Sequence, residues 1–340
     1  MNILHFVNFY NGGGSTKTCF EHVKNLTNHK HFFIGSDEGE YKTYFSQIGK
    51  SYSIYRDSNF NYPELFVKEI IRKNKIDLIH FYLPGHENPS FLRGIDLPKI
   101  CTFLCGQVAG FDGDIFDHVR FISEYNKNLN SEKLSNFKSH SVVRCGLGSK
   151  SEVFPPPKRN KEIIFGRISA FCPSKRLLDT LECAKNFKNN KFIIAGQVQD
   201  HNYFNQVKNF IQQNNMTNTA LEININEGRK EFLYENIDVL HYPTTNEAFC
   251  YSIVEGMQRC KSVISYNDSA IPELEKDAAL KLVEKDNIEE LISATEYYIK
   301  NPEVSAMHGT KNRSAYEAHL TSESYAENMN SIYESFSNEL

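Results

Sequence analysis

The stretch Tyr242-Pro-Thr-Thr-Asn-Glu247-Ala-Phe-Cys-Tyr-Ser-Ile-Val-Glu255-Gly-Met contains two carboxylates with seven residues between them. An apolar run joins the two acids, and a β-type segment, Val239-Leu-His-Tyr242, precedes them. This order predicts a strand, a loop and then a helix over residues 251–258. Units of this kind build a parallel α/β sheet, in which a ligand at the end of a strand meets a helix N-terminus.

The two acids allow two interpretations. If the helix begins as early as Ala248, the amides of Ala248, Phe249 and Cys250 face the end of the strand and favour an anion. Eight helical positions would then place Glu247 and Glu255 roughly 12 Å apart, near the span between the sugar and the ribose of a nucleotide-sugar. Alternatively, Glu247 is a helix-start carboxylate stabilised by the helix dipole, and Glu255 is a solvated helix residue.

Several stretches together resemble one enzyme family. Residues 247–255 resemble the E-x7-E signature of the GT4 family of retaining glycosyltransferases, and residues 256–265 resemble the strand that follows it. Residues 270–274 resemble the family's G-x-P-E turn, and residues 163–169 its G-R-L/I-S strand end. The resemblance implies the GT-B architecture: an α/β protein with two Rossmann-like domains facing across a cleft, and a C-terminal helix crossing back to the N-terminal domain.

The resemblance also implies roles for the acids. Glu247 would contact hydroxyls of the donor sugar, while the amides of Ala248, Phe249 and Cys250 orient its ring. Glu255 would accept hydrogen bonds from ribose hydroxyls. The donor would be a nucleotide-diphosphate sugar, transfer would retain anomeric configuration, and no metal or other cofactor would be needed.

Two cations complete the implied catalytic set. Arg167 ends a strand and Lys175 opens the next helical segment, and a pair of cations suits a departing diphosphate. By resemblance they are the family's Arg/Lys pair. They are eight positions apart, where about five is usual in the family. Either Lys175 or Arg176 could therefore be the second cation of the pair. As isolated residues they would be read as surface charges.

A glycine-rich loop, Gly12-Gly13-Gly14, follows the first apolar run. It lets the backbone approach a phosphate or sugar closely, although a plain flexible turn is the alternative. Thr16 stands where a P-loop needs glycine before Lys17, so ATPase chemistry is disfavoured. The G-x-G-x-x-G dinucleotide fingerprint also fails. By resemblance, the loop lies near the donor pyrophosphate.

Length and composition bound the architecture. A chain of 340 residues with 40% hydrophobic residues predicts two ordered domains. We expect an N-terminal acceptor-side domain at 1–154, a nucleotide-sugar-binding domain at 155–320 and a returning helix at 321–340; the prolines after Phe154 mark the boundary. Expected strands are 3–7, 32–34, 53–55, 78–81, 100–104, 120–122, 141–143, 163–165, 192–195, 221–225, 239–242, 262–265 and 280–283. Expected helices are 16–27, 63–74, 124–137, 176–187, 203–214, 229–235, 251–258, 288–300 and 322–336.

Charge and cysteine usage restrict the partners and the compartment. The net charge of -4 argues against nucleic-acid binding. The basic segment 126–144 could contact an anionic acceptor or a membrane surface, although a solvated helix face is the commoner explanation. Eight separate cysteines without a C-x2-C pair disfavour zinc and disulfides. With neither a leader nor a long apolar stretch evident, we expect a cytoplasmic protein, at most peripheral to the inner face of a membrane.

Three other patterns occur outside these motifs. Asp112-Gly113-Asp114 resembles a metal-binding D-x-D, but in the wrong architecture. Many GT4 members carry a histidine near the position of Leu104 or Cys105, and this chain has none there; Gln107 could substitute as a donor. His80 matches the family's D-x-I-H strand end, and a structural role suits it better than a ligand role.

We therefore expect a retaining glycosyltransferase that acts on a saccharide or lipid-linked saccharide acceptor, in polysaccharide or glycolipid assembly. A GT-B-fold nucleotide-sugar 2-epimerase and a noncatalytic nucleotide-sugar-binding relative are the alternatives.

Overall fold

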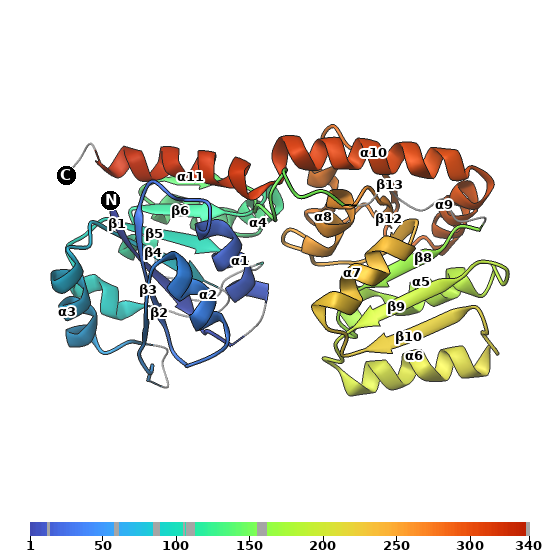
Figure 1. The fold of residues 1–340 in the computed structure, drawn as a ribbon, viewed down its shortest axis with the longest axis horizontal. Helices are drawn as coiled ribbons and strands as arrows, with labels where there is room; N and C mark the ends of the chain where they lie inside the picture. The colour runs from blue at the N-terminus through green and yellow to red at the C-terminus, as the bar shows by residue number, and fades with distance from the viewer. Residues whose placement is uncertain are drawn as a thin grey trace. The chain divides into compact units, whose positions relative to one another are not determined.

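The computed structural model describes residues 1–11, 14–57, 61–83, 89–104, 106, 113–154 and 162–337. Its contacts divide the chain into two units (Figure 1). The N-terminal unit comprises residues 1–149 and 320–340, and the C-terminal unit comprises residues 150–319. Each is a parallel α/β sheet covered by helices, so the predicted fold class of two Rossmann-like domains is confirmed.

The described residues of the N-terminal unit form a seven-stranded sheet in the order β3-β2-β1-β4-β5-β6-β7. Every pairing in it is parallel. Its strands are β1 (Asn2–Asn8), β2 (Lys30–Gly35), β3 (Lys50–Ser53), β4 (Leu78–Leu83), β5 (Lys99–Phe103), β6 (His118–Phe121) and β7 (His140–Val142). Its helices are α1 (Gly14–Val23), α2 (Tyr41–Ile48), α3 (Glu64–Asn74), α4 (Glu124–Leu129), α11 (Ser322–Ser337) and the 3-10 turns η1 (Ser90–Gly94), η2 (Gly113–Ile115) and η3 (Ser131–Asn136).

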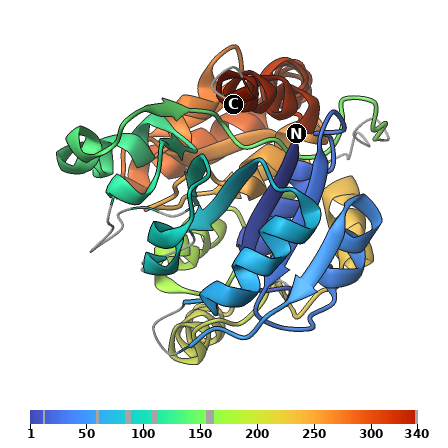
Figure 2. The same ribbon diagram turned by 90° about the vertical axis from the view of Figure 1, so that its left-hand side faces the viewer.

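The last helix, α11, packs on this sheet. Its buried residues Tyr325, Met329 and Tyr333 recur on one face and contact strand residues such as Ile3 and Ile100. Near the end of α11, Ser337 Oγ donates to Met1 Sδ over 2.9 Å, so the helix ends beside the start of the chain (Figure 2). The burial of this apolar stripe is what holds the helix to the unit.

Buried imidazoles lie between the sheet and the helices α1 and α11. His80, fully buried on β4, contacts Tyr333 Oη over 2.6 Å and Thr102 Oγ1 over 2.7 Å. His22 on α1 stacks on Tyr325 with ring centroids 3.9 Å apart. Because both ring nitrogens of His80 have partners, it is a structural histidine of the core.

The described residues of the C-terminal unit form a six-stranded parallel sheet in the order β10-β9-β8-β11-β12-β13. Its strands are β8 (Phe165–Ile168), β9 (Phe192–Gly196), β10 (Thr219–Ile223), β11 (Val239–Tyr242), β12 (Ser262–Tyr266) and β13 (Leu280–Val283). Its helices are α5 (Leu177–Ala184), α6 (His201–Gln213), α7 (Glu227–Asn236), α8 (Tyr251–Gln258), α9 (Ile288–Lys300), α10 (Pro302–His319) and the 3-10 turns η4 (Pro173–Lys175) and η5 (Ile271–Glu275).

The order of each sheet reverses beside its first strand. In the C-terminal unit β8 lies between β9 and β11, and the chain proceeds outward from β8 in both directions. Helices that leave such neighbouring strands in opposite directions open a crevice at the carboxyl ends of the strands, where α/β proteins bind their ligands. We therefore expect a ligand-binding site at the carboxyl ends of β8 and β11.

Candidate functional site

The site is built on the ends of β8 and β11. All four residues of β11 are buried, and Pro243 then ends the strand because it has no N–H to offer a neighbouring strand. The segment that follows is tied to two neighbouring loops. Thr245 N donates to Ser174 O over 3.2 Å, and Ala270 N donates to Glu247 O over 3.1 Å. These bonds fix the backbone on both sides of the first predicted acid.

Glu247 and Lys175 meet at this place. The Lys175 Nζ atom lies 2.6 Å from Glu247 Oε1, and the hydroxyl of Thr244 donates to the same oxygen over 2.9 Å. The Glu247 side chain is 11% exposed and that of Lys175 is 24% exposed. The structure thus brings two of the predicted catalytic residues into direct contact, and part of each side chain is exposed to solvent.

Electrostatics favours the charged form of Lys175. Burial by itself would lower the pKa of the ammonium, but Tyr242 and Glu247 outweigh burial and the pKa rises. Lys175 is therefore a permanent cation near neutral pH. A cation held at the end of a strand is suited to binding an anionic group of a ligand.

Arg167, the third predicted catalytic residue, lies beneath this pair. It is 1% exposed, and burial lowers the pKa of its guanidinium. The guanidinium donates to Pro243 O over 2.7 Å, to Ser169 Oγ over 3.1 Å and to the carbonyl of Lys175, and it packs 4.3 Å from the centre of the Tyr242 ring. Arg167 thus connects β8, the Lys175 turn and the end of β11.

Arg176 points elsewhere, although its spacing left it eligible alongside Lys175. Its Nε donates to Asp179 Oδ2 over 2.8 Å, and its Nη2 pairs with the carboxylate of Asp286. The backbone of Arg176 has a φ of 52°, which turns the chain between η4 and α5. Of the two candidates, Lys175 is the one that the structure brings to Glu247.

The helix after Glu247 begins later than the expectation based on Ala248. Helix α8 starts at Tyr251, and Cys250 precedes it with a φ of 72°. Phe249 and Cys250 are buried, at 4% and 5% exposure. The amides of residues 248–250 therefore belong to the loop and not to the first helical turn, and the estimated 12 Å along one helix axis does not apply. The helix starts late because Cys250 adopts the left-handed conformation, which is uncommon for residues other than glycine and which the sequence pattern does not indicate.

Glu255 lies on α8 and is not the solvated residue of the alternative interpretation. Its side chain is 12% exposed. Lys230 Nζ lies 3.1 Å from Glu255 Oε1, and the hydroxyl of Tyr234 donates to Glu255 Oε2 over 3.0 Å. Sequence reasoning missed both partners, for which the only signal is their spacing of four residues on α7.

The predicted glycine loop belongs to the N-terminal unit. Gly12 and Gly13 lie outside the described residues, while Gly14 is the first residue of α1. Just after it, Thr16 Oγ1 donates to Phe9 O over 3.0 Å, which holds the connection between β1 and α1. The loop thus follows the carboxyl end of β1, where the order of the N-terminal sheet reverses.

The structure describes only some of the minor candidates. Asp114 makes two hydrogen bonds with Arg93, at 2.9 and 3.1 Å, and Asp112, Cys105 and Gln107 lie outside the described residues. Within the part of the chain that the structure describes, no group of three or more His, Cys, Asp or Glu side chains could hold a metal ion. In the basic segment, Lys127 pairs with Glu124 and Lys138 with Asp117.

Comparisons with known proteins concern the fold and the family. Residues 149–315 match the model of the family described as glycosyl transferases group 1. A glycosyltransferase from Rickettsia africae ESF-5 has a similar structure, with a TM-score of 0.81 and 18% identity over 98% of both chains. No curated protein matches the sequence.

Two other solved structures share the whole fold. Sucrose-phosphate synthase from Thermosynechococcus elongatus is 14% identical over 100% of both chains, with a TM-score of 0.79. Anabaena HepE, solved in complex with UDP and glucose, is 13% identical over 98% of this chain and 100% of its own, with a TM-score of 0.77. The family match covers just under half of the chain, and the solved structures share its two-domain GT-B fold.

Proposed function

We propose that this protein of GT-B fold is a glycosyltransferase, which moves a sugar from a nucleotide-diphosphate sugar to an acceptor hydroxyl and retains the configuration at the anomeric carbon, as GT4 enzymes do. The observation that carries the proposal is the contact between Lys175 and Glu247 at the carboxyl ends of β8 and β11. A carboxylate that can accept from sugar hydroxyls and a cation that can meet a diphosphate are there side by side.

The chemistry assigns each residue a task. As the bond between the anomeric carbon and the diphosphate oxygen breaks, negative charge grows on the leaving group and Lys175 stabilises it. The acceptor oxygen forms the new bond on the same face of the sugar, and its proton passes to an oxygen of the departing phosphate. Glu247 holds sugar hydroxyls, and Arg167 keeps the turn of Lys175 in place through its carbonyl. The charge for the leaving group thus comes from side chains, and we propose a transfer that uses no metal.

The donor is bound, in this proposal, by the C-terminal unit. The structures of Anabaena HepE with UDP and with UDP-glucose support a nucleotide-sugar as the ligand of this fold. Glu255, which follows Glu247 on the adjoining helix α8, would accept from the ribose hydroxyls. The glycine loop after β1 would contact the diphosphate.

The acceptor is a saccharide or a lipid-linked saccharide. We assign it to the N-terminal unit, whose basic segment 126–144 would contact an anionic acceptor or the headgroups of a membrane surface. No helix of the described residues is long and apolar enough to cross a membrane. We propose a cytoplasmic enzyme of polysaccharide or glycolipid assembly.

A two-stage experiment tests this function. Thermal-shift screening against nucleoside diphosphates and nucleotide-sugars identifies the donor, because a ligand that binds the folded state raises the melting temperature. The donor is then incubated with acceptor mixtures, and released nucleotide and the anomeric configuration of the product are measured. We expect nucleotide release that depends on the acceptor. An acceptor-free sugar product would indicate an epimerase, and tight binding without turnover on any acceptor would indicate a noncatalytic protein.

A further inference from the structure

The carboxylate of Glu255 is held at both of its oxygens. Lys230 Nζ lies 3.1 Å from Oε1, and Tyr234 Oη lies 3.0 Å from Oε2. Tyr234 is fully buried, and the side chains of Lys230 and Glu255 are each 12% exposed. The carboxylate is therefore paired at both oxygens and is largely withdrawn from solvent.

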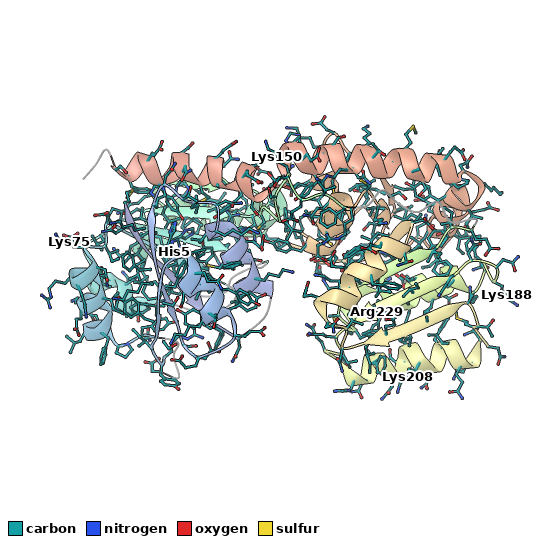
Figure 3. All side chains as sticks on the ribbon, in the orientation of Figure 1. His5, Lys75, Lys150, Lys188, Lys208 and Arg229 are labelled. Carbon is teal, nitrogen blue, oxygen red and sulfur yellow. The ribbon has the colours of Figure 1, made fainter. Side chains whose placement is uncertain are left out.

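The two donors come from one face of α7. Lys230 and Tyr234 are four residues apart, which places them on the same side of the helix. Lys230 also pairs with Glu227 over 2.7 Å, one turn earlier on that helix. The adjacent Arg229, which is labelled in Figure 3, pairs with Glu222 instead, over 2.6 Å, so neighbouring cations on α7 pair with different acids.

Arg259 locks α7 against α8. Its guanidinium donates to both carboxylate oxygens of Glu231 on α7, over 2.9 and 2.7 Å, and to Glu255 O over 3.1 Å. It also packs 4.9 Å from the centre of the Tyr234 ring. The backbone of Glu255 and the ring of Tyr234 therefore contact the same guanidinium.

Both donors keep their protons near neutral pH. Burial raises the pKa of Tyr234, and Glu255 raises it further. Burial would lower the pKa of Lys230, but Glu255 and Glu227 outweigh burial and raise it. An ionised carboxylate has about four lone-pair positions on its two oxygens, so one donor at each oxygen does not by itself exhaust its capacity.

We propose that Lys230 and Tyr234 are positioning residues that aim the two oxygens of Glu255 at the vicinal 2′- and 3′-hydroxyls of a nucleotide ribose, and so make the donor site selective for ribonucleotides over 2′-deoxyribonucleotides. The inference rests on the proposed function. Two hydroxyls on adjacent carbons match two oxygens that are each held from the other side. A ligand without the 2′-hydroxyl makes one hydrogen bond fewer to this carboxylate, and that loss weakens binding in a partly desolvated site.

The test is the ratio of affinities for UDP and 2′-deoxy-UDP, with the ADP and GDP pairs in parallel, measured by isothermal titration calorimetry on the full chain. Removing the Tyr234 hydroxyl with Tyr234→Phe should weaken UDP binding about fivefold and 2′-deoxy-UDP binding less than twofold. Lys230→Met should act in the same direction, and Lys230→Arg, which keeps the charge, should restore most of the selectivity.

Two variants control for general effects. Arg229→Met removes the neighbouring cation of α7, and Tyr298→Phe removes a hydroxyl that lies 2.8 Å from His308 Nδ1 in the same unit. Neither should alter the ratio, and circular dichroism checks that every variant is folded.

The outcomes separate the inference from the function on which it rests. An unchanged ratio in folded Tyr234→Phe and Lys230→Met, with wild-type sugar transfer intact, would overturn the positioning role alone. A wild-type protein that binds no nucleoside diphosphate would overturn the proposed function, and the positioning role with it. A lowered ratio in both variants, restored by Lys230→Arg, supports the proposal.

Discussion

Lys175 Nζ lies 2.6 Å from Glu247 Oε1, so the cation proposed for the leaving group and the acid proposed for the sugar are paired with each other. A diphosphate carries more negative charge than one carboxylate and can compete for the ammonium. When the donor binds, we expect Lys175 to turn to the diphosphate and leave Glu247 to accept from sugar hydroxyls. The pair is then a resting state that keeps both side chains ordered before the substrate arrives.

Removing the Lys175 charge should therefore slow the chemical step. We expect Lys175→Met to lower kcat about 100-fold, the size of effect seen when a group that stabilises developing charge is removed. Steady-state kinetics with the identified donor measures it. Lys300→Met is the matched control, because Lys300 pairs with Glu296 on the exposed face of α9. Equal kcat values for the two variants would remove Lys175 from the mechanism.

The two acids should respond differently to the same change. Glu247→Ala should mainly lower kcat, because the lost contacts are with the reacting sugar. Glu255→Ala should mainly raise KM for the donor, because the lost contacts are with the ribose and are the same before and during reaction. Kinetics that match the wild type for both variants would contradict the assignment of both residues.

Arg167 should affect stability as much as activity. Arg167→Met leaves the carbonyls of Pro243 and Lys175 without their buried donor, which should destabilise the C-terminal unit by about 3 kcal/mol. Arg167→Lys should recover little, because a lysine cannot reproduce the planar fork of donors. Urea unfolding of the C-terminal unit, followed by a probe local to it, measures the loss. A stability equal to that of the wild type would show that the guanidinium is not holding the strand end.

The buried histidines predict an acid-sensitive N-terminal unit. Burial lowers the pKa of His31 and of His118 to about 4, and it holds those of His5, His22 and His80 well below 6.5. His5 lies inside the unit in Figure 3. Below about pH 6.5 the unfolded chain binds protons that the folded unit refuses, so stability falls as pH falls from 6.5 toward 4.

Thermal unfolding at pH 7.5, 6.5 and 5.5 checks this expectation. The N-terminal unit should melt at a lower temperature at pH 6.5 than at pH 7.5, and lower again at pH 5.5. Above pH 7, its melting temperature should equal the value at pH 7.5. A melting temperature that stays level between pH 7.5 and 5.5 would show that these imidazoles can take up protons while the unit is folded.

Most of the fold could be predicted because parallel sheets leave a strong signal. Buried strands such as β9, Phe-Ile-Ile-Ala-Gly, are apolar runs, and the chain alternates between buried strands and amphipathic helices. The missed helix α2, Tyr41–Ile48, is only eight residues long and fully buries only Phe45, with Tyr41 and Ile48 partly buried beside it. Strand β8 ends three residues later than expected, at Ile168, because Gly166 and Arg167 pair with β9 despite being poor strand formers.

The site could be predicted only at the level of its motif residues. The acids and cations were found by resemblance, and their contact with one another follows from the packing of loops 72 residues apart in the chain. The late start of α8 depends on a left-handed Cys250, and the orientation of Glu255 depends on α7. Such features arise from tertiary contacts between segments, which neither residue type nor spacing records.

A crystal structure with the best-binding nucleoside diphosphate, obtained from the thermal-shift screen, tests the account most directly. We predict a diphosphate within hydrogen-bond distance of Lys175 Nζ and a ribose whose hydroxyls donate to Glu255, with Glu247 released from the ammonium. A nucleotide bound away from the carboxyl ends of β8 and β11, with Lys175 still paired to Glu247, would contradict it.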